Sequence, residues 1–456
     1  MLQDPTPELD VLADADERAR RWTAGIGARP VFPTADALRG LAHFDEPLPA
    51  YGRGAAATLR LLDEYGSPAA VETNGGRYFG FVTGATLPAA AAADRLVLAW
   101  DNGALGHVTS PVAAAVERVA GRWLLDILDL PRDSAVGFTT SATAGTLIAV
   151  ATARRSLLAR QGWDVDRRGL GGAPEIRVVV SDLAHVAVLK ALRVLGFGLD
   201  NLIVAPTDAH GRVDPARLPP LDAGTILILQ AGEVNTGEFD PFEQLVPRAR
   251  AAGAWTHVDG AFGLWARASA HRALTGGVDG ADSWTVDGHK WLNTPYDAAM
   301  VVVRDPQALA ETMNADAEYS TTAADSQRNL TLEFSRRARG VPVWAALRSL
   351  GRDGVADLVE RTVAMSADLA AGLRVAGYTV LNRVVLNQII ASAGSDDETL
   401  RVVDEAQASG RTWFGSSRWR GRPVLRISVS SWRTRPEDIR DLLELLRELR
   451  REPLGR

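Results

Sequence analysis

The sequence predicts an α/β fold in which helices cover both faces of a mostly parallel sheet. From about residue 110 to residue 305, short β-branched runs alternate with amphipathic helical stretches. The runs are apolar at consecutive positions, which is typical of strands that are buried on both faces. Strands separated by helices favour parallel pairing, because the chain must cross over the sheet between them.

The strands and helices of this region can be placed in order along the chain. We expect strands at Ile176–Ser181, Leu202–Ala205, Thr225–Gln230, Trp255–Asp259 and Ala298–Val303. The helices between them are expected at Thr143–Arg160, His185–Leu195 and Phe242–Ala252. This sheet would lie in a large domain that covers residues 73–345.

Helical sequence flanks the predicted sheet on both sides. Residues 1–72 are expected to form a helical N-terminal segment, with helices at Pro7–Trp22 and Gly54–Tyr65. Residues 346–456 are expected to form a small α/β domain, entered through a helical stretch that begins at Val341. Its predicted elements are the rest of the helix Val341–Ala376, strands at Tyr378–Leu381 and Val424–Val429, and a last helix at Pro436–Arg451.

The composition is that of a globular protein without disulfides. Of 456 residues, 46% are hydrophobic and 23% charged, so disorder is not expected. The chain has no cysteine, which excludes disulfides and thiolate metal sites and fits a reducing compartment. The net charge of −6 gives no reason to expect nucleic acid as a partner. The apolar stretches are too short for a membrane span, and the N-terminus lacks a signal pattern. We therefore expect a cytoplasmic protein with no membrane partner.

Lys290 stands out because the chain has only one other lysine, Lys190, among many arginines. It lies in the sequence His289-Lys290-Trp291, just before a predicted strand. An amine can form an imine with a carbonyl compound, whereas a guanidinium cannot. The alternative is a surface lysine beside a packed tryptophan.

Two other polar residues follow predicted strands. Asp259 ends the strand Trp255–Asp259, and His185 comes shortly after Ile176–Ser181. Ligands of open parallel sheets bind at the carboxyl ends of strands, where a histidine can lie flat over a cofactor ring. A capping role for Asp259 and a structural role for His185 are the alternatives.

A possible phosphate site opens the first long helix of the sheet region. Ser141, Ala142 and Thr143 lie where the helix begins. The free N–H groups and the dipole of a helix N-terminus attract a phosphate, and hydroxyl groups add donors. Ser and Thr cap many helices without any ligand, so capping remains the alternative.

In this order, the four pieces resemble the group II pyridoxal 5′-phosphate (PLP)-dependent amino acid decarboxylases. This family includes the aromatic-L-amino-acid, histidine and glutamate decarboxylases. The resemblance extends from about Tyr78 to Trp432 and implies the PLP-dependent transferase fold type I, with PLP as the cofactor. It also implies decarboxylation of an L-amino acid and a homodimer whose subunits share their active sites.

The resemblance assigns a role to each matching residue. Lys290 would be the Schiff-base lysine, Asp259 would pair with the ring nitrogen, and His185 would stack on the ring. Asp287 stands where the animal enzymes often have asparagine, and a carboxylate near a phosphate is unfavourable unless it bonds to backbone or faces away. Further contacts with the cofactor would come from Ser141, Ala142, Thr143, Thr236, Ala261 and His289.

The resemblance places the substrate near an aromatic run and a segment of the neighbouring subunit. Tyr78, Phe79 and Phe81 would wall the substrate pocket, and His107 would reach the site of the other subunit, with packing as the alternative for all four. The aromatic run favours an aromatic or apolar side chain, whereas Arg77 or His107 would favour an acidic one. Arg426 is expected either to bind a substrate carboxylate or to serve the structure of the small domain.

The sequence departs from the family in one stretch. The animal enzymes carry a mobile-loop tyrosine thought to return a proton after CO₂ leaves. The comparable stretch Tyr319–Asn329 has no tyrosine at that place. Protonation would then come from His185, Lys290 or water, and other reactions of the PLP-bound carbanion stay open. The alternatives are therefore a PLP-dependent aminotransferase, an oxidative deaminase or a C–C lyase.

Two rivals come from other classes of protein. A non-catalytic binding protein on this fold would be expected to lose Lys290 or Asp259, and both are intact. A Rossmann dehydrogenase would need a Gly-x-Gly-x-x-Gly turn after an early strand, which is lacking. No metal site is expected.

Overall fold

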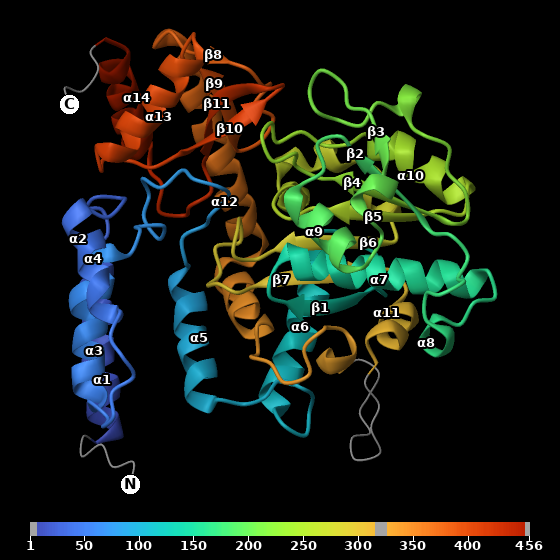
Figure 1. Ribbon diagram of the computed structural model, residues 1–456, viewed down its shortest axis with the longest axis horizontal. Helices are drawn as coiled ribbons and strands as arrows, with labels where there is room; N and C mark the ends of the chain where they lie inside the picture. The colour runs from blue at the N-terminus through green and yellow to red at the C-terminus, as the bar shows by residue number, and fades with distance from the viewer. Residues whose placement is uncertain (1–6, 315–325, 452–456) are drawn as a thin grey trace.

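The computed structural model describes residues 7–314 and 326–451, and it contains two sheets (Figure 1). The larger sheet has seven strands in the order β1-β7-β6-β5-β4-β2-β3. Strand β7 runs antiparallel to its neighbours β1 and β6, while the remaining pairs are parallel. The mostly parallel sheet is therefore confirmed. Its strands are β1 Ala135–Thr139, β2 Arg177–Ser181, β3 Ile203–Ala205, β4 Thr225–Gln230, β5 Trp255–Asp259, β6 Ser283–Asp287 and β7 Ala299–Val303.

Both faces of the large sheet are buried. Along β4, Leu227 and Leu229 belong to one hydrophobic cluster, while Ile226 and Ile228 belong to another. Successive side chains of a strand point to opposite faces, so the two clusters lie on opposite sides of the sheet. This is the reason for the uninterrupted apolar runs in the sequence, and helix α7, Ala142–Arg160, covers the second face (Figure 1).

Strands β4 and β5 have the predicted bounds, and β2, β3 and β7 each begin one residue later than predicted. Strands β1 and β6 were not predicted. The predicted helices of the sheet region correspond to α7, α9 and α10. The helices around the large sheet are α5 Pro88–Trp100, α6 Pro111–Ile127, α7, α8 Val165–Arg168, α9 Val186–Val194, α10 Phe242–Ala251 and α11 Pro306–Met313.

The second sheet belongs to the C-terminal part of the chain. Its order is β10-β11-β9-β8, with antiparallel pairing throughout. A separate hydrophobic cluster lies between this sheet and its helices. The elements are α12 Gly340–Val375, β8 Thr379–Val380, β9 Gln388–Ser392, α13 Asp396–Ala408, β10 Gly415–Trp419, β11 Arg422–Ser428 and α14 Pro436–Arg451.

Helix α12 connects the two parts. It is interrupted at Gly351, whose φ of 65° lies in the left-handed region that glycine tolerates. The proposed division into residues 1–72, 73–345 and 346–456 cuts this helix, and it stays a prediction.

The N-terminal helices stand beside the large domain as a separate column (Figure 1). They are α1 Glu8–Ala24, α2 Ala35–Gly40, α3 Ala55–Leu61 and α4 Ser67–Ala69. No residue of these four helices is buried. Within residues 7–314 and 326–451, no helix has the length and apolarity needed to cross a membrane.

Candidate active site

The site lies at the carboxyl ends of β5 and β6, which are parallel neighbours. Asp259 is the last residue of β5 and pairs with Thr285 of β6, two residues before Asp287. Lys290 follows in the turn after β6, and its Nζ lies 3.0 Å from Asp287 Oδ2. Lys290 therefore follows β6, and Asp259, the predicted carboxylate, ends the neighbouring strand β5.

Asp259 is held by the turn that follows it. Its Oδ1 accepts a hydrogen bond from the N–H of Ala261 at 3.1 Å, and the carboxylate is almost completely buried. The carbonyl oxygen of Ala261 in turn accepts the N–H of Asp287 at 2.9 Å. Ala261 thus links the two carboxylates through backbone contacts.

His185 caps α9 and faces the same charges. Its Nδ1 accepts the N–H of Ala187 at 3.2 Å. Burial lowers the pKa of His185; the Asp259 carboxylate opposes this shift and Lys290 adds to it. These interactions place His185 within electrostatic reach of both Asp259 and Lys290, as the convergence of the three residues requires.

Asp287 takes a place beside the predicted phosphate site. Its Oδ1 accepts the N–H of Ala142, the first residue of α7, at 2.8 Å. Ser141 caps the same helix, since its Oγ accepts the N–H of Ala144. Asp287 thus meets one of the two conditions that make a carboxylate tolerable near a phosphate, because it bonds to backbone.

His289 lies on the other side of this carboxylate. Its Nε2 is 3.8 Å from Asp287 Oδ2, and burial lowers the pKa of His289. The ring stacks on Tyr296 with 4.4 Å between centroids. Tyr296 comes from the turn before β7, and the sequence did not single it out.

The loop after β4 connects the site to the small domain. The hydroxyl of Thr236 donates to Glu233 Oε2 at 3.0 Å, so its proton is used within the loop. Arg426 of β11 is largely buried, and its Nε donates to the carbonyl oxygen of Val234 at 2.7 Å. Burial lowers the pKa of Arg426 to about 10, while Glu233 opposes the shift. Arg426 also acts on His185 electrostatically, so it belongs to the same site.

The aromatic run divides between a stack and the core. Tyr78 stacks on Trp413 at 5.0 Å, and Phe81 stacks on the same indole at 5.7 Å. Burial, with a smaller contribution from Tyr296, raises the pKa of Tyr78 to about 12, which places the two phenols near each other. Phe79 is fully buried in the core of the small domain. The position of Phe79 is therefore explained by packing, which was the alternative to a role in the substrate pocket.

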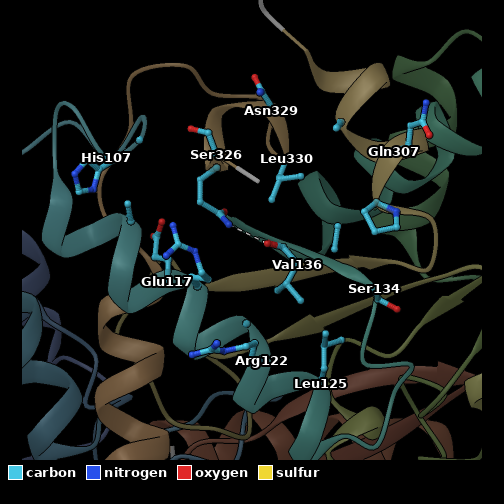
Figure 2. Close-up of a pocket in the computed structure, with 18 of the residues that line it drawn as sticks. His107, Glu117, Arg122, Leu125, Ser134, Val136, Gln307, Ser326, Asn329 and Leu330 are labelled. Carbon is cyan, nitrogen blue, oxygen red and sulfur yellow. Dashed lines mark hydrogen bonds between the residues drawn. The ribbon is translucent and has the colours of Figure 1, made fainter. Parts of the chain in front are cut away.

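His107 lies in a different place. It lines a cavity of about 890 Å³ beside α6 and β1, which also includes Glu117, Arg122 and Gln327 (Figure 2). None of Lys290, Asp259, His185 and Asp287 lines this cavity. On the single chain, His107 is therefore apart from the Lys290 site. Tyr319 lies outside the described residues.

The residues present fit PLP. They supply an amine for the carbonyl carbon, a buried carboxylate for the ring nitrogen, an imidazole near both, and a helix N-terminus for a phosphate. The described ranges contain no group of three or more potential metal ligands among His, Asp and Glu. A sheet of this topology with such a lysine and carboxylate defines the class of fold type I PLP enzymes.

Comparisons with known proteins identify the family within this class. The family described as "Pyridoxal-dependent decarboxylase conserved domain" matches residues 73–385. The chain belongs to this family, and it is a PLP-dependent carboxy-lyase that acts on an amino acid. The resemblance inferred from the motifs is confirmed.

The most similar proteins agree in length and fold. Tryptophan decarboxylase 1 of Oryza sativa subsp. japonica is 27% identical, over 89% of this chain and 86% of its own. L-2,4-diaminobutyrate decarboxylase of Rhizobium meliloti (strain 1021) is 26% identical, over 91% and 86%. The crystal structure of Oryza sativa TDC with PLP and tryptamine has a TM-score of 0.90 and 22% identity, covering 100% of both chains. The last comparison confirms the fold.

Proposed function

We propose that this enzyme decarboxylates an L-amino acid with an aromatic side chain and binds its PLP through Lys290. The observation that carries the proposal is the place of the Lys290 amine, 3.0 Å from Asp287 at the carboxyl end of β6 and beside the Asp259 end of β5. Lys190, the other lysine, lies exposed on α9. Only Lys290 has a carboxylate, an imidazole and a helix N-terminus around it.

Each side chain has a distinct task in this proposal. PLP, when bound, accepts the electron pair that the substrate Cα gains as CO₂ leaves. The Asp259 carboxylate would keep the ring nitrogen protonated, since an opposite charge at hydrogen-bond distance favours the charged form. His185 would lie over the ring and, after taking up a second proton from solvent, donate one as an imidazolium. The freed Lys290 amine is the second candidate donor.

The aromatic side chains near the site support an aromatic substrate. Tyr78, Trp413 and Phe81 form a continuous stack, and Tyr296 adds a ring against His289. Offset and stacked rings attract further aromatic rings through dispersion and their quadrupoles. The tryptophan decarboxylase of rice is one relative with such a substrate in its name. A diaminobutyrate decarboxylase is equally similar, so the substrate panel must include a basic amino acid.

We also propose a cytoplasmic homodimer. Large apolar side chains are exposed along the N-terminal column and along α5 and its loop, namely Leu9, Leu12, Leu48, Tyr51, Leu62, Leu96, Leu98, Trp100 and Val108. Several large apolar side chains exposed on neighbouring elements favour a protein interface there. A second copy of the chain that covers it would also cover the His107 loop, in agreement with the shared site that the resemblance implies. The lack of cysteine fits a reducing compartment.

The first experiment uses the two lysines as target and control. PLP would be added to the wild-type chain, to Lys290→Arg and to Lys190→Arg, and its visible absorbance recorded before and after borohydride reduction. We expect a reducible band and a modified peptide at position 290 in the wild type and in Lys190→Arg. A band that persists in Lys290→Arg would overturn the assignment of Lys290.

The second experiment identifies the reaction. The PLP-loaded enzyme would be given tryptophan, tyrosine, phenylalanine, glutamate and 2,4-diaminobutyrate, and CO₂, amine, keto acid, aldehyde and ammonia would be measured. CO₂ with an equal amount of aromatic amine is expected. Keto acid would favour the aminotransferase, and aldehyde with ammonia the oxidative deaminase, which is the alternative left open by the missing loop tyrosine.

A further inference from the structure

Asp287 is a buried carboxylate at the site with contacts to both a helix N-terminus and the lysine. It is 2% exposed, and its Oδ1 accepts the Ala142 N–H while its Oδ2 lies 3.0 Å from Lys290 Nζ. A buried carboxylate on strand β6 therefore bridges the N-terminus of α7 and the lysine. Neither contact is needed for the ring-nitrogen role, which belongs to Asp259.

These contacts are the ones that a phosphate would be expected to use. The N-terminus of α7 carries a partial positive charge and unpaired N–H groups, which attract an anion. Asp287 already accepts the first of these groups, and Ser141 uses the Ala144 N–H and the Gly145 N–H. Among the described residues, the backbone N–H of Thr143 is the donor in the first turn of α7 for which no partner is found.

The negative charge of Asp287 balances the positive charges that lie around it. One ammonium and one helix N-terminus face one carboxylate, and His289 is kept neutral by burial. A phosphate adds a charge of about −1.5 to −2 to this group. The added anion repels Asp287 across a partly buried space, where charges are screened less than in water.

We propose that the Asp287 carboxylate takes the role of the phosphate at the α7 N-terminus when PLP is absent, and that it thereby sets the affinity of the enzyme for its cofactor. Before PLP binds, this carboxylate stabilises the α7 N-terminus and pairs with the Lys290 amine. Binding of a phosphate-bearing ligand competes with Asp287 for the α7 N-terminus, so the carboxylate weakens binding. Asp287 is therefore a positioning residue, and the inference rests on the proposed roles of Lys290 and α7.

The variant Asp287→Asn tests the proposal because an amide keeps the acceptor for Ala142 and loses the charge. The first probe is inorganic phosphate, with the melting temperature of the cofactor-free chain as the readout. Without phosphate, the variant should melt at a lower temperature than the wild type, since the Lys290 contact loses its charge. With millimolar phosphate, the variant should gain more in melting temperature than the wild type. Equal gains would overturn the proposal.

The second probe is the cofactor itself, titrated by absorbance against pyridoxal, which lacks the phosphate. Asp287→Asn should bind PLP about tenfold more tightly or better, because unit charges several ångströms apart at a partly buried site repel by more than one tenfold step. Its affinity for pyridoxal should change less than twofold. Tighter binding of both ligands would assign the effect to the Lys290 amine alone and overturn the competition with phosphate.

Two controls separate charge from packing. Asp282 lies just before β6, at the opposite end of the same strand, and its Oδ2 accepts the Thr256 N–H at 2.8 Å. Asp282→Asn should leave PLP affinity unchanged, and Asp287→Glu, which keeps the charge, should gain none. If Asp287→Glu gains as much as Asp287→Asn, the proposal fails. If the wild-type chain shows no lysine-dependent band, the proposed cofactor attachment fails instead, so the two failures are distinguishable.

Discussion

The imidazole of His185 accepts the backbone N–H of Ala187 through Nδ1, at 3.2 Å. A neutral imidazole that accepts at Nδ1 carries its proton on Nε2. The backbone of α9 therefore fixes the tautomer of His185, and burial, which lowers its pKa, keeps the ring neutral. Nε2 is therefore the nitrogen that can face the substrate, and the ring must take up a second proton before it can return one to the substrate.

Replacing His185 with phenylalanine keeps a flat ring and removes both nitrogens. If His185 supplies the proton, kcat should fall by about 10²- to 10⁴-fold, the usual contribution of a general acid or base. The visible absorbance of bound PLP should remain, because Lys290 and Asp259 are intact. A kcat within twofold of wild type would assign protonation to Lys290 or water.

The pH dependence of the wild type tests the same residue. The pKa of His185 lies below its ordinary value of 6.5, so the ring should stay neutral as the pH falls from 8 to 6.5. If the imidazolium of His185 is the donor, its contribution to kcat should grow as the pH falls and should level off only below 6.5. A contribution that levels off at or above pH 6.5, absent in His185→Phe, would contradict the lowered pKa.

Arg426 should bind the carboxylate of the substrate. Its Nε is used by Val234, and no acceptor from the described residues is found for Nη1 and Nη2. Lysine cannot reproduce the planar fork of a guanidinium. Arg426→Lys should therefore raise KM by about tenfold or more, as expected for loss of a charge-assisted bidentate contact.

The structural alternative for Arg426 has a different signature. Loss of the bond to Val234 alone should lower the melting temperature and leave KM close to wild type. Steady-state kinetics and thermal unfolding of the same Arg426→Lys preparation therefore separate the two roles. A normal KM with a lowered melting temperature would remove Arg426 from the substrate site.

Tyr296 should contribute to aromatic substrate preference. Its ring is 60% exposed on the single chain, although it stacks on His289 beside Lys290. Tyr296→Ala should raise KM for tryptophan or tyrosine by about tenfold, since aromatic pairs contribute about 0.5–1.5 kcal/mol beyond their buried area. Tyr296→Phe keeps the ring and should resemble wild type. An equal rise in both variants would implicate the hydroxyl instead.

The sequence was sufficient for five of the seven strands of the large sheet and for the order of the chemistry along it. Strand β4 has an uninterrupted apolar run, residues 226–229, because both sheet faces are covered, and this signal is local. Strand β6, Ser283–Asp287, alternates polar and apolar residues, so it lacks the apolar run by which the other strands are predicted. For this reason the sequence does not show that Asp287 ends a strand, although the resemblance puts this carboxylate near the phosphate site.

The neighbourhood of the aromatic run could not be predicted, because its partners are distant in sequence. The N–H of Phe79 donates to the carbonyl of Trp413, and the carbonyl of Phe79 accepts the N–H of Ser428. The run thus joins the small domain in an extended conformation. Neighbouring side chains of extended backbone point to opposite sides, so Phe79 enters the core while Tyr78 faces Trp413. A contact between residues more than 300 positions apart leaves no local signal.

His257, two residues before Asp259, should make the stability of the protein depend on pH. It is completely buried, its Nδ1 lies 3.0 Å from Ser283 Oγ, and its Nε2 has no partner. Burial lowers the pKa of His257 from 6.5 to about 4. The unfolded chain therefore binds the proton first, and the contribution to stability is complete above pH 6.5 and lost as the pH falls toward 4.

The comparison with His257→Gln isolates this residue. As the pH falls from 6.5 to 4, the free energy of unfolding of the wild type should decrease relative to the variant by on the order of 3 kcal/mol. Urea unfolding at several pH values measures the difference. Parallel curves for the two proteins over this range would show that His257 titrates normally.

The last prediction concerns Glu117 of α6, which lines the cavity in Figure 2 and forms an ion pair with Arg336. Both side chains are buried, with Arg336 Nη1 at 3.0 Å from Glu117 Oε1. The same oxygen accepts the N–H of Gly340, the first residue of α12, at 3.0 Å.

Glu117→Gln leaves the guanidinium buried without its counter-charge and should destabilise the fold by about 3–5 kcal/mol. The double variant Glu117→Leu with Arg336→Met removes both charges and should lose much less than the sum of the single variants. Urea unfolding of the four proteins gives the coupling energy. Additive losses would mean that the pair does not interact, whereas strong coupling would show that this buried ion pair helps to hold the start of α12 against α6.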